Sequence, residues 1–198
     1  MNYRKYQKAR DLAWRVLIDE KVTALPINIV ALCRKMGIKV QYYKPKDDND
    51  GYCTIFLGRP RIFVSSECSP ERQRFTIAHE LGHILLGHVG RAELVNREPS
   101  GTDNPLEHDA NVFASRLLAP ACVLWALDIR TPEQIAQLCR ISYQSARFRA
   151  KRMEMLYARN KFLTSPLERQ VYAQFGGFIA GKKAEAYRSS GTSGKLSR

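Results

Sequence analysis

The sequence predicts a mixed α+β fold, in which a small β-sheet lies beside one central helix and a helical C-terminal region follows. Two observations predict it. Short runs in which apolar and polar residues alternate, a pattern typical of strands, fall within residues 38–64. Apolar residues recur at helical spacing before this segment, and most of the chain that follows it is helical in pattern or composition.

The N-terminal part of the chain is predicted to contain two helices and three strands. Helical apolar spacing covers residues 4–20 and again 27–36, where a glycine follows as a C-cap. Alternation over 38–42 predicts a strand, and residues 52–57 and 61–64 flank a Gly-Arg-Pro turn and predict a hairpin.

Three further helices are predicted beyond the hairpin. Ser69-Pro70-Glu71 combines a serine cap, a proline at the first helical position and an early acidic residue, so a helix is expected to run from there to about Gly87. A second is expected over 106–118, before Pro120. Thr131 begins another, and the segment to about residue 160 is helical in composition.

Charge divides the chain unevenly. Of the net charge of +13, a balance of +10 lies between Arg140 and Arg198, where 13 Lys and Arg residues face three acids. We therefore expect a catalytic domain over 1–125, a helix-turn-helix-like region over 126–163 and a basic, flexible tail over 164–198. The five scattered cysteines form no C-x-x-C pair, which favours reduced thiols in the cytoplasm. No run of 18 apolar residues predicts a membrane span.

The run His79-Glu80-Leu81-Gly82-His83 predicts a zinc site. On a helix, His79 and His83 project from one face about one turn apart, where their imidazoles can share one Zn²⁺. Glu80 lies to the side, where it can act as the catalytic base toward a water molecule. Apart from Glu80, residues 75–86 contain no Asp, Glu, Lys, Arg or proline, and burying these polar groups without a role is costly.

A catalytic zinc ion needs a third protein ligand, and the helix after Pro105 offers three candidates. Glu107 is favoured, with Asp109 and His108 as alternatives. Asn111 lies four residues after Glu107 on the same face, so it is expected to orient a ligating histidine.

Two motifs together resemble the ImmA/IrrE metallopeptidases. The first is residues 73–86, QRFTIAHELGHILL, and the second is residues 107–120, E-x-x-A-N-x-F-A-x-x-L-L-A-P. The resemblance covers roughly residues 10–155. It implies a zincin-like fold with His79, His83 and Glu107 on zinc and Glu80 as base. It also implies a gene-regulatory protease that cleaves a helix-turn-helix repressor in mobile-element or stress regulation.

The basic region after residue 131 resembles a helix-turn-helix. Ile141-Ser142 stands at the turn, although Arg140 occupies the position where a glycine normally eases it. Four residues of the second helix are candidates for phosphate contacts: Arg147, Arg149, Lys151 and Arg152. The alternative is a helical pair that packs on the catalytic domain with a solvated basic face.

Two functions from different classes follow. The first is a zinc-dependent, site-specific endopeptidase whose substrate, a helix-turn-helix repressor, adds as an extended strand at the sheet edge. The second is a DNA-binding regulator or toxin–antitoxin partner in which the metal site is structural.

Overall fold

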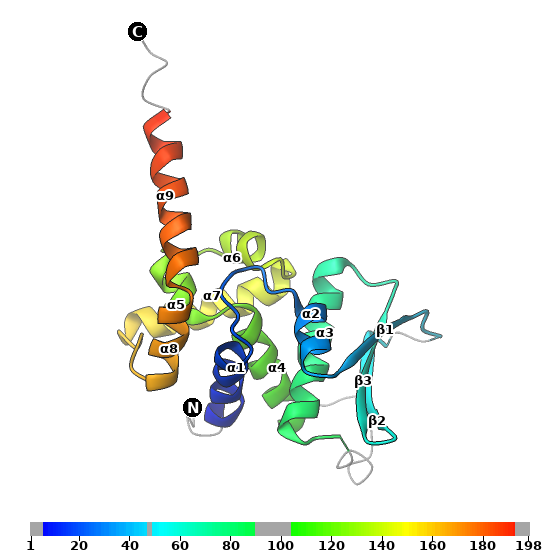
Figure 1. The fold of residues 1–198 in the computed structure, drawn as a ribbon. Coiled ribbons are helices and arrows are strands. Elements are labelled where there is room, and N and C mark those ends of the chain that lie inside the picture. The colour runs from blue at the N-terminus through cyan, green and yellow to red at the C-terminus, as the bar shows by residue number, and fades with distance from the viewer. Residues whose placement is uncertain (1–5, 47–48, 90–103, 193–198) are drawn as a thin grey trace.

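The computed structural model describes residues 6–46, 49–89 and 104–192, and side chains as far as residue 188. A small sheet lies at one end of the molecule, and helices make up the rest (Figure 1). The sequence correctly predicts this α+β fold class. The elements in chain order are α1 (Gln7–Asp19), α2 (Ile29–Lys35), β1 (Lys39–Tyr43), β2 (Gly51–Phe56), β3 (Arg59–Ser65), α3 (Pro70–Leu86), α4 (Pro105–Leu118), α5 (Ala121–Ala126), α6 (Pro132–Cys139), α7 (Tyr143–Ala158), α8 (Pro166–Gln174) and α9 (Gly176–Thr192).

The sheet has the strand order β1-β3-β2. The predicted hairpin is present as the antiparallel pair of β2 and β3, with Cys53 opposite Ile62. Leu57 and Gly58 at its turn both have positive φ, of 49° and 73°. β1 pairs with β3 in parallel, and α2 also contacts β1. The order leaves β2 at one edge of the described sheet.

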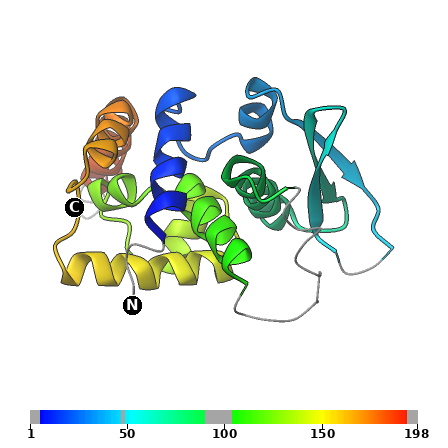
Figure 2. The ribbon, with the colours of Figure 1, turned by 90° about the horizontal axis from the view of Figure 1, so that it is seen from below.

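Helix α3 lies between the sheet and helix α4. The side chain of Ser69 accepts a hydrogen bond from the Arg72 amide, and Gly87 ends the helix in the left-handed conformation, as the sequence predicts. One side of α3 packs on β2 and β3, and the other packs on α4. Figure 2 shows α3 in this position, between the sheet and α4. Its buried residues include Ile77, Ala78 and Leu81.

A glycine sets the close approach of α3 and α4. A Cβ atom on Gly82 would lie 3.0 Å from Cδ1 of Phe113 and 3.3 Å from Cα of Ala110. Contacts this short are tighter than ordinary packing, so a methyl group at this position would push Phe113 or the α4 backbone back by a few tenths of an ångström. Gly82 therefore favours the close packing of the two helices.

One hydrophobic core connects the N-terminal helix to the C-terminal ones. Helix α1 packs on both α4 and α8, and the core runs from Ala9 to Ile179. The prediction of a flexible tail over 164–198 is wrong for its described part, where α8 and α9 form. Val171, Phe175 and Ile179 recur every four residues and are buried, so this stripe anchors the segment. None of the described helices combines the length and apolar composition that a membrane crossing requires.

We predict that Gly82→Ala destabilises the fold relative to Gly181→Ala in α9, where an added Cβ meets nothing within 4 Å. Both substitutions gain helix propensity, so the difference between their free energies of unfolding reports the cost of packing a methyl group between α3 and α4. This cost should be about 1–3 kcal/mol. Urea unfolding followed by circular dichroism measures it. Equal stabilities for the two variants would show that the α3–α4 contact tolerates a methyl group.

Candidate metal centre

Three side chains from two helices converge on one point. His79 and His83 come from α3, and Glu107 comes from the first turn of α4. Their nearest ligand atoms all lie within 4.8 Å of one another. The two Nε2 atoms are 2.9 Å apart, and the Glu107 carboxylate lies 3.1 Å from Nε2 of His79 and 3.4 Å from Nε2 of His83.

Local sequence positions each of these groups. The i,i+4 spacing puts both histidines on the face of α3 that looks toward α4. The side chain of Asn104 caps α4 by accepting a hydrogen bond from the Leu106 amide, and Pro105 follows at the first helical position. This start places Glu107 beside the two imidazoles. The structure thus brings Glu107 into the cluster, as the sequence favours.

The alternative ligands lie elsewhere. His108 is exposed, and its ring is 4.2 Å from the ring of Tyr6. Asp109 does not belong to the group of His79, His83 and Glu107 that could hold a metal ion.

Two neighbours orient the histidines. The side-chain oxygen of Asn111 lies 3.0 Å from Nδ1 of His79 and accepts its proton, which leaves the lone pair of Nε2 directed at the cluster. His88 faces His83 in the same region: the two Nδ1 atoms are 3.1 Å apart. When His83 donates its Nδ1 proton to His88, its Nε2 also presents a lone pair to the cluster.

His88 is the residue that sequence reasoning missed. It lies beyond the end of α3, outside the two motifs from which the sequence predicts the site. The left-handed Gly87 instead turns the chain back, and the His88 amide donates to the His83 carbonyl oxygen at 2.9 Å. His88 is buried as a result. A glycine cap followed at once by histidine was the available signal.

Contacts within the cluster shift the pKa values of Glu107 and His79. Hydrogen bonds from His79 and then His83 hold the pKa of the Glu107 carboxyl far below its ordinary value. Burial lowers the pKa of His79, but the hydrogen bond to Glu107 and the nearby Glu80 carboxylate outweigh it and raise the pKa overall. Glu80 is 9% exposed, on the same helix between the two histidines. The site therefore favours positive charge at its centre.

The residues fit a zinc ion. When both Nε2 atoms are unprotonated, two imidazole nitrogens and one carboxylate direct lone pairs at the same point, an arrangement that repels itself unless a cation lies between them. Two histidines and a glutamate are also a donor set found in catalytic zinc sites, where a fourth position stays open.

The candidate nucleic-acid residues on α7 separate into two groups. Arg147 and Lys151 are exposed. Arg149 and Arg152 instead line a cavity between helices, and Arg149 is 1% exposed. The turn before α7 does contain a left-handed residue: Arg140 has φ 49° and ψ 57°. An arginine thus adopts the conformation for which glycine is the usual choice.

The family model described as the IrrE N-terminal-like domain matches residues 33–151. The chain belongs to the ImmA/IrrE metallopeptidase family. The radiation response metalloprotease IrrE of Deinococcus deserti is 37% identical over 93 residues, which are 43% of this chain and 32% of the relative. That of Deinococcus radiodurans is 37% identical over 68 residues, or 32% and 20% of the two chains. The chain thus spans a third or less of these curated relatives.

A solved structure shares the fold of this ImmA/IrrE chain. It is a Mycobacterium tuberculosis transcriptional regulator, with a TM-score of 0.53 and 18% sequence identity. The match covers 73% of this chain and 48% of the regulator. At this identity the likeness concerns the fold alone.

We predict that His88→Ala and Asn111→Ala each weaken zinc binding by about 10–100-fold, because the ligating histidines lose their orienting partners. Competition with a fluorescent chelator measures the affinity, and circular dichroism verifies folding. His108→Ala is the matched control and should bind zinc as the wild type does. If His88→Ala binds zinc with the affinity of the wild type, His88 does not orient a zinc ligand.

Proposed function

We propose that this protein is a zinc-dependent endopeptidase that cleaves a helix-turn-helix transcriptional repressor at a specific bond. The convergence of His79, His83 and Glu107 around one point, with Glu80 beside it, carries the proposal. Family membership and relatives named as metalloproteases support the peptidase class. The relatives' radiation response and the neighbour's title as a transcriptional regulator support a role in regulation.

The protein's own residues account for the proton transfers of peptide hydrolysis. Zinc held by the two histidines and Glu107 would supply a Lewis acid that makes water more acidic and polarises a peptide carbonyl. Glu80 would accept the proton of the attacking water and then donate it to the leaving amine. Asn111 and His88 would keep the imidazoles in the tautomer that leaves Nε2 unprotonated.

The sheet edge offers a place for the substrate. β2 pairs with β3 along one side only within the described sheet, and it packs on α3, the helix that carries both histidines. Ile55 and Phe56 near its end are about half exposed, at 51% and 52%. We propose that an extended substrate segment adds to β2 through main-chain hydrogen bonds, so that it runs beside the active-site helix.

Cysteine environments support a cytoplasmic location. No disulfide bond links any of the five cysteines, all of which lie in the described part of the chain. Burial raises the pKa of the Cys33 and Cys122 thiols to about 12, so they stay protonated and unreactive at neutral pH. We propose that the protein acts in the reducing cytoplasm, where such thiols are stable.

A second candidate function is a DNA-binding regulator or toxin–antitoxin partner with a structural metal site. One observation favours it: Tyr143, Arg147, Phe148 and Lys151 form an exposed basic and aromatic face on α7. A gel shift with upstream DNA that weakens with salt and with loss of Arg147 and Lys151 would support this function.

We predict that Glu80→Gln abolishes cleavage, with at least a 10²–10⁴-fold loss of rate, and still binds one zinc ion. The substrate is the repressor encoded beside the gene, and intact mass spectrometry detects the cut. Glu71→Gln, in the first turn of the same helix, is the matched control and should cleave at the wild-type rate. Cleavage by Glu80→Gln at the wild-type rate would contradict the assigned base.

A further inference from the structure

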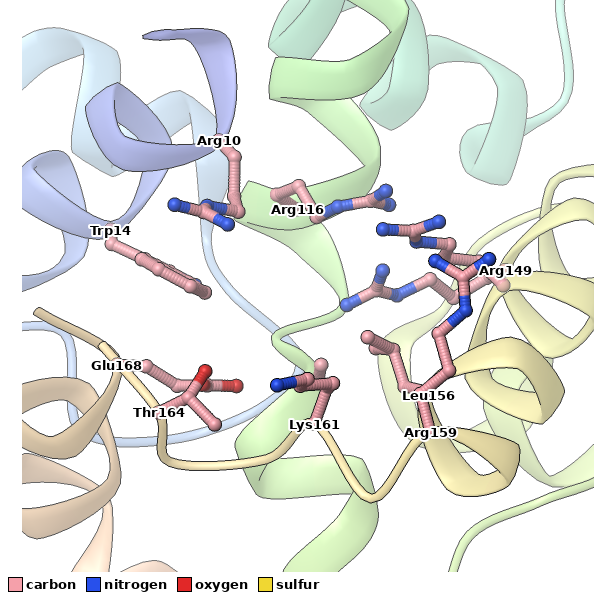
Figure 3. A pocket seen from close by; sticks show the side chains of 11 residues that line it. Arg10, Trp14, Arg116, Arg149, Leu156, Arg159, Lys161, Thr164 and Glu168 are labelled. Atoms are coloured by element: carbon pink, nitrogen blue, oxygen red, sulfur yellow. The ribbon is translucent and has the colours of Figure 1, made fainter. Parts of the chain in front are cut away.

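A basic cavity lies among α1, α4, α7 and α8, away from the sheet. Its volume is about 410 Å³, which is within the range of small-molecule sites. Six of its lining side chains are basic: Arg10, Arg116, Arg149, Arg152, Arg159 and Lys161. Figure 3 shows the labelled basic side chains, from separate elements, directed toward a common space.

Arg149 is the one buried side chain among the basic residues that line this cavity. Its side chain is 1% exposed, and its Nε donates to the carbonyl oxygen of Ala119 at 2.8 Å. Both terminal nitrogens, Nη1 and Nη2, are buried and have no hydrogen-bond partner among the described residues. Burial lowers the pKa of Arg149 to about 10, so the group is still charged at neutral pH. A buried charged group with unpaired donors is costly unless a ligand accepts its hydrogen bonds.

The acidic residues nearby compensate for only part of this charge. Glu168 is the one acidic residue that lines the cavity, and burial raises the pKa of its carboxyl. Arg10 pairs with Asp11 at 2.7 Å and lies over the ring of Trp14, 4.7 Å from its centroid. The remaining basic side chains still outnumber the acids. Trp14 and Leu156 add apolar surface to the wall.

We propose that this cavity binds a small phosphorylated anion that carries at least two phosphate groups. The planar fork of arginine matches phosphate oxygens in a bidentate manner, and several forks here face one space. A ligand with a single carboxylate group would neutralise only one of the positive charges that line the cavity. Duplex DNA presents its phosphates on a broad outer surface, and these cannot reach a side chain as buried as Arg149.

The ligand would join parts of the chain that are far apart in sequence. Its contacts would come from α1, α4, α7 and the segment from Arg159 to Glu168. Helix α4 also carries Glu107, nine residues before Arg116, or about 13 Å along the helix axis. Because the ligand binds the folded protein, it should raise the unfolding temperature.

The test is isothermal titration calorimetry of the zinc-loaded protein with tripolyphosphate at 150 mM salt, together with thermal unfolding. ATP, orthophosphate and a DNA duplex are titrated in parallel. Arg149→Met removes the buried guanidinium, and Arg159→Gln and Lys161→Gln change exposed side chains that line the same cavity. Arg147→Gln is the matched control, because it removes an exposed charge from the same helix. His79→Ala/His83→Ala removes the metal ligands, since polyphosphates chelate zinc.

We expect one tripolyphosphate per chain and a raised unfolding temperature. Each cavity variant should lose about tenfold or more in affinity, because a charge-assisted hydrogen bond is lost, whereas Arg147→Gln and the double histidine variant should keep it. ATP binding with the same dependence would support a nucleotide as the source of the phosphates. The proposal is wrong if neither tripolyphosphate nor ATP binds. It is also wrong if Arg147→Gln weakens binding as much as the cavity variants do. A third contradicting result is that the cavity variants weaken binding of the DNA duplex but not of tripolyphosphate or ATP.

Discussion

The close packing of α3 on α4 brings the side chains of the metal-binding cluster together from two helices. Gly82, between the two histidines of the motif, lets α4 approach until Ala110 and Phe113 lie against α3. That distance allows Glu107, one turn before Ala110, to reach both imidazoles from a separate helix. The same helix pair separates the sheet from the C-terminal helices. The proposed metal ligands and part of the hydrophobic core therefore depend on one helix–helix contact.

The sequence predicted best what local geometry determines. The i,i+4 histidine pair, the caps of α3 and the hairpin depend on neighbouring residues, so pattern alone locates them. The third ligand of the predicted site comes from a different helix, and its identity depends on how the two helices pack. Sequence spacing alone therefore could not decide among Glu107, Asp109 and His108. His88 was missed because its contact with His83 follows from the left-handed turn at Gly87, which the helical pattern before it does not describe.

Charge and composition were poorer guides in the C-terminal third. The Gly, Ser and Lys content suggested a flexible tail, yet the stripe of Val171, Phe175 and Ile179 anchors two helices. A count of basic residues also cannot show which of them face inward. Arg149 shares a buried face of α7 with Ala146, Ala150 and Met153, so it enters the interior. The basic block thus comprises an exposed face on α7 and an internal cavity, which differ in what they can bind.

We propose that His79, His83 and Glu107 hold one zinc ion. X-ray absorption at the zinc edge of the purified protein reports the ligands directly. We expect one zinc per chain, surrounded by nitrogen and oxygen at roughly 2.0–2.2 Å, with two imidazoles resolved and no sulfur. The imidazole signal should fall to one in His83→Ala. Zinc–sulfur contacts near roughly 2.3 Å, or no stoichiometric zinc, would contradict the proposal, because cysteine ligation or a metal-free protein leaves these three residues without the assigned role.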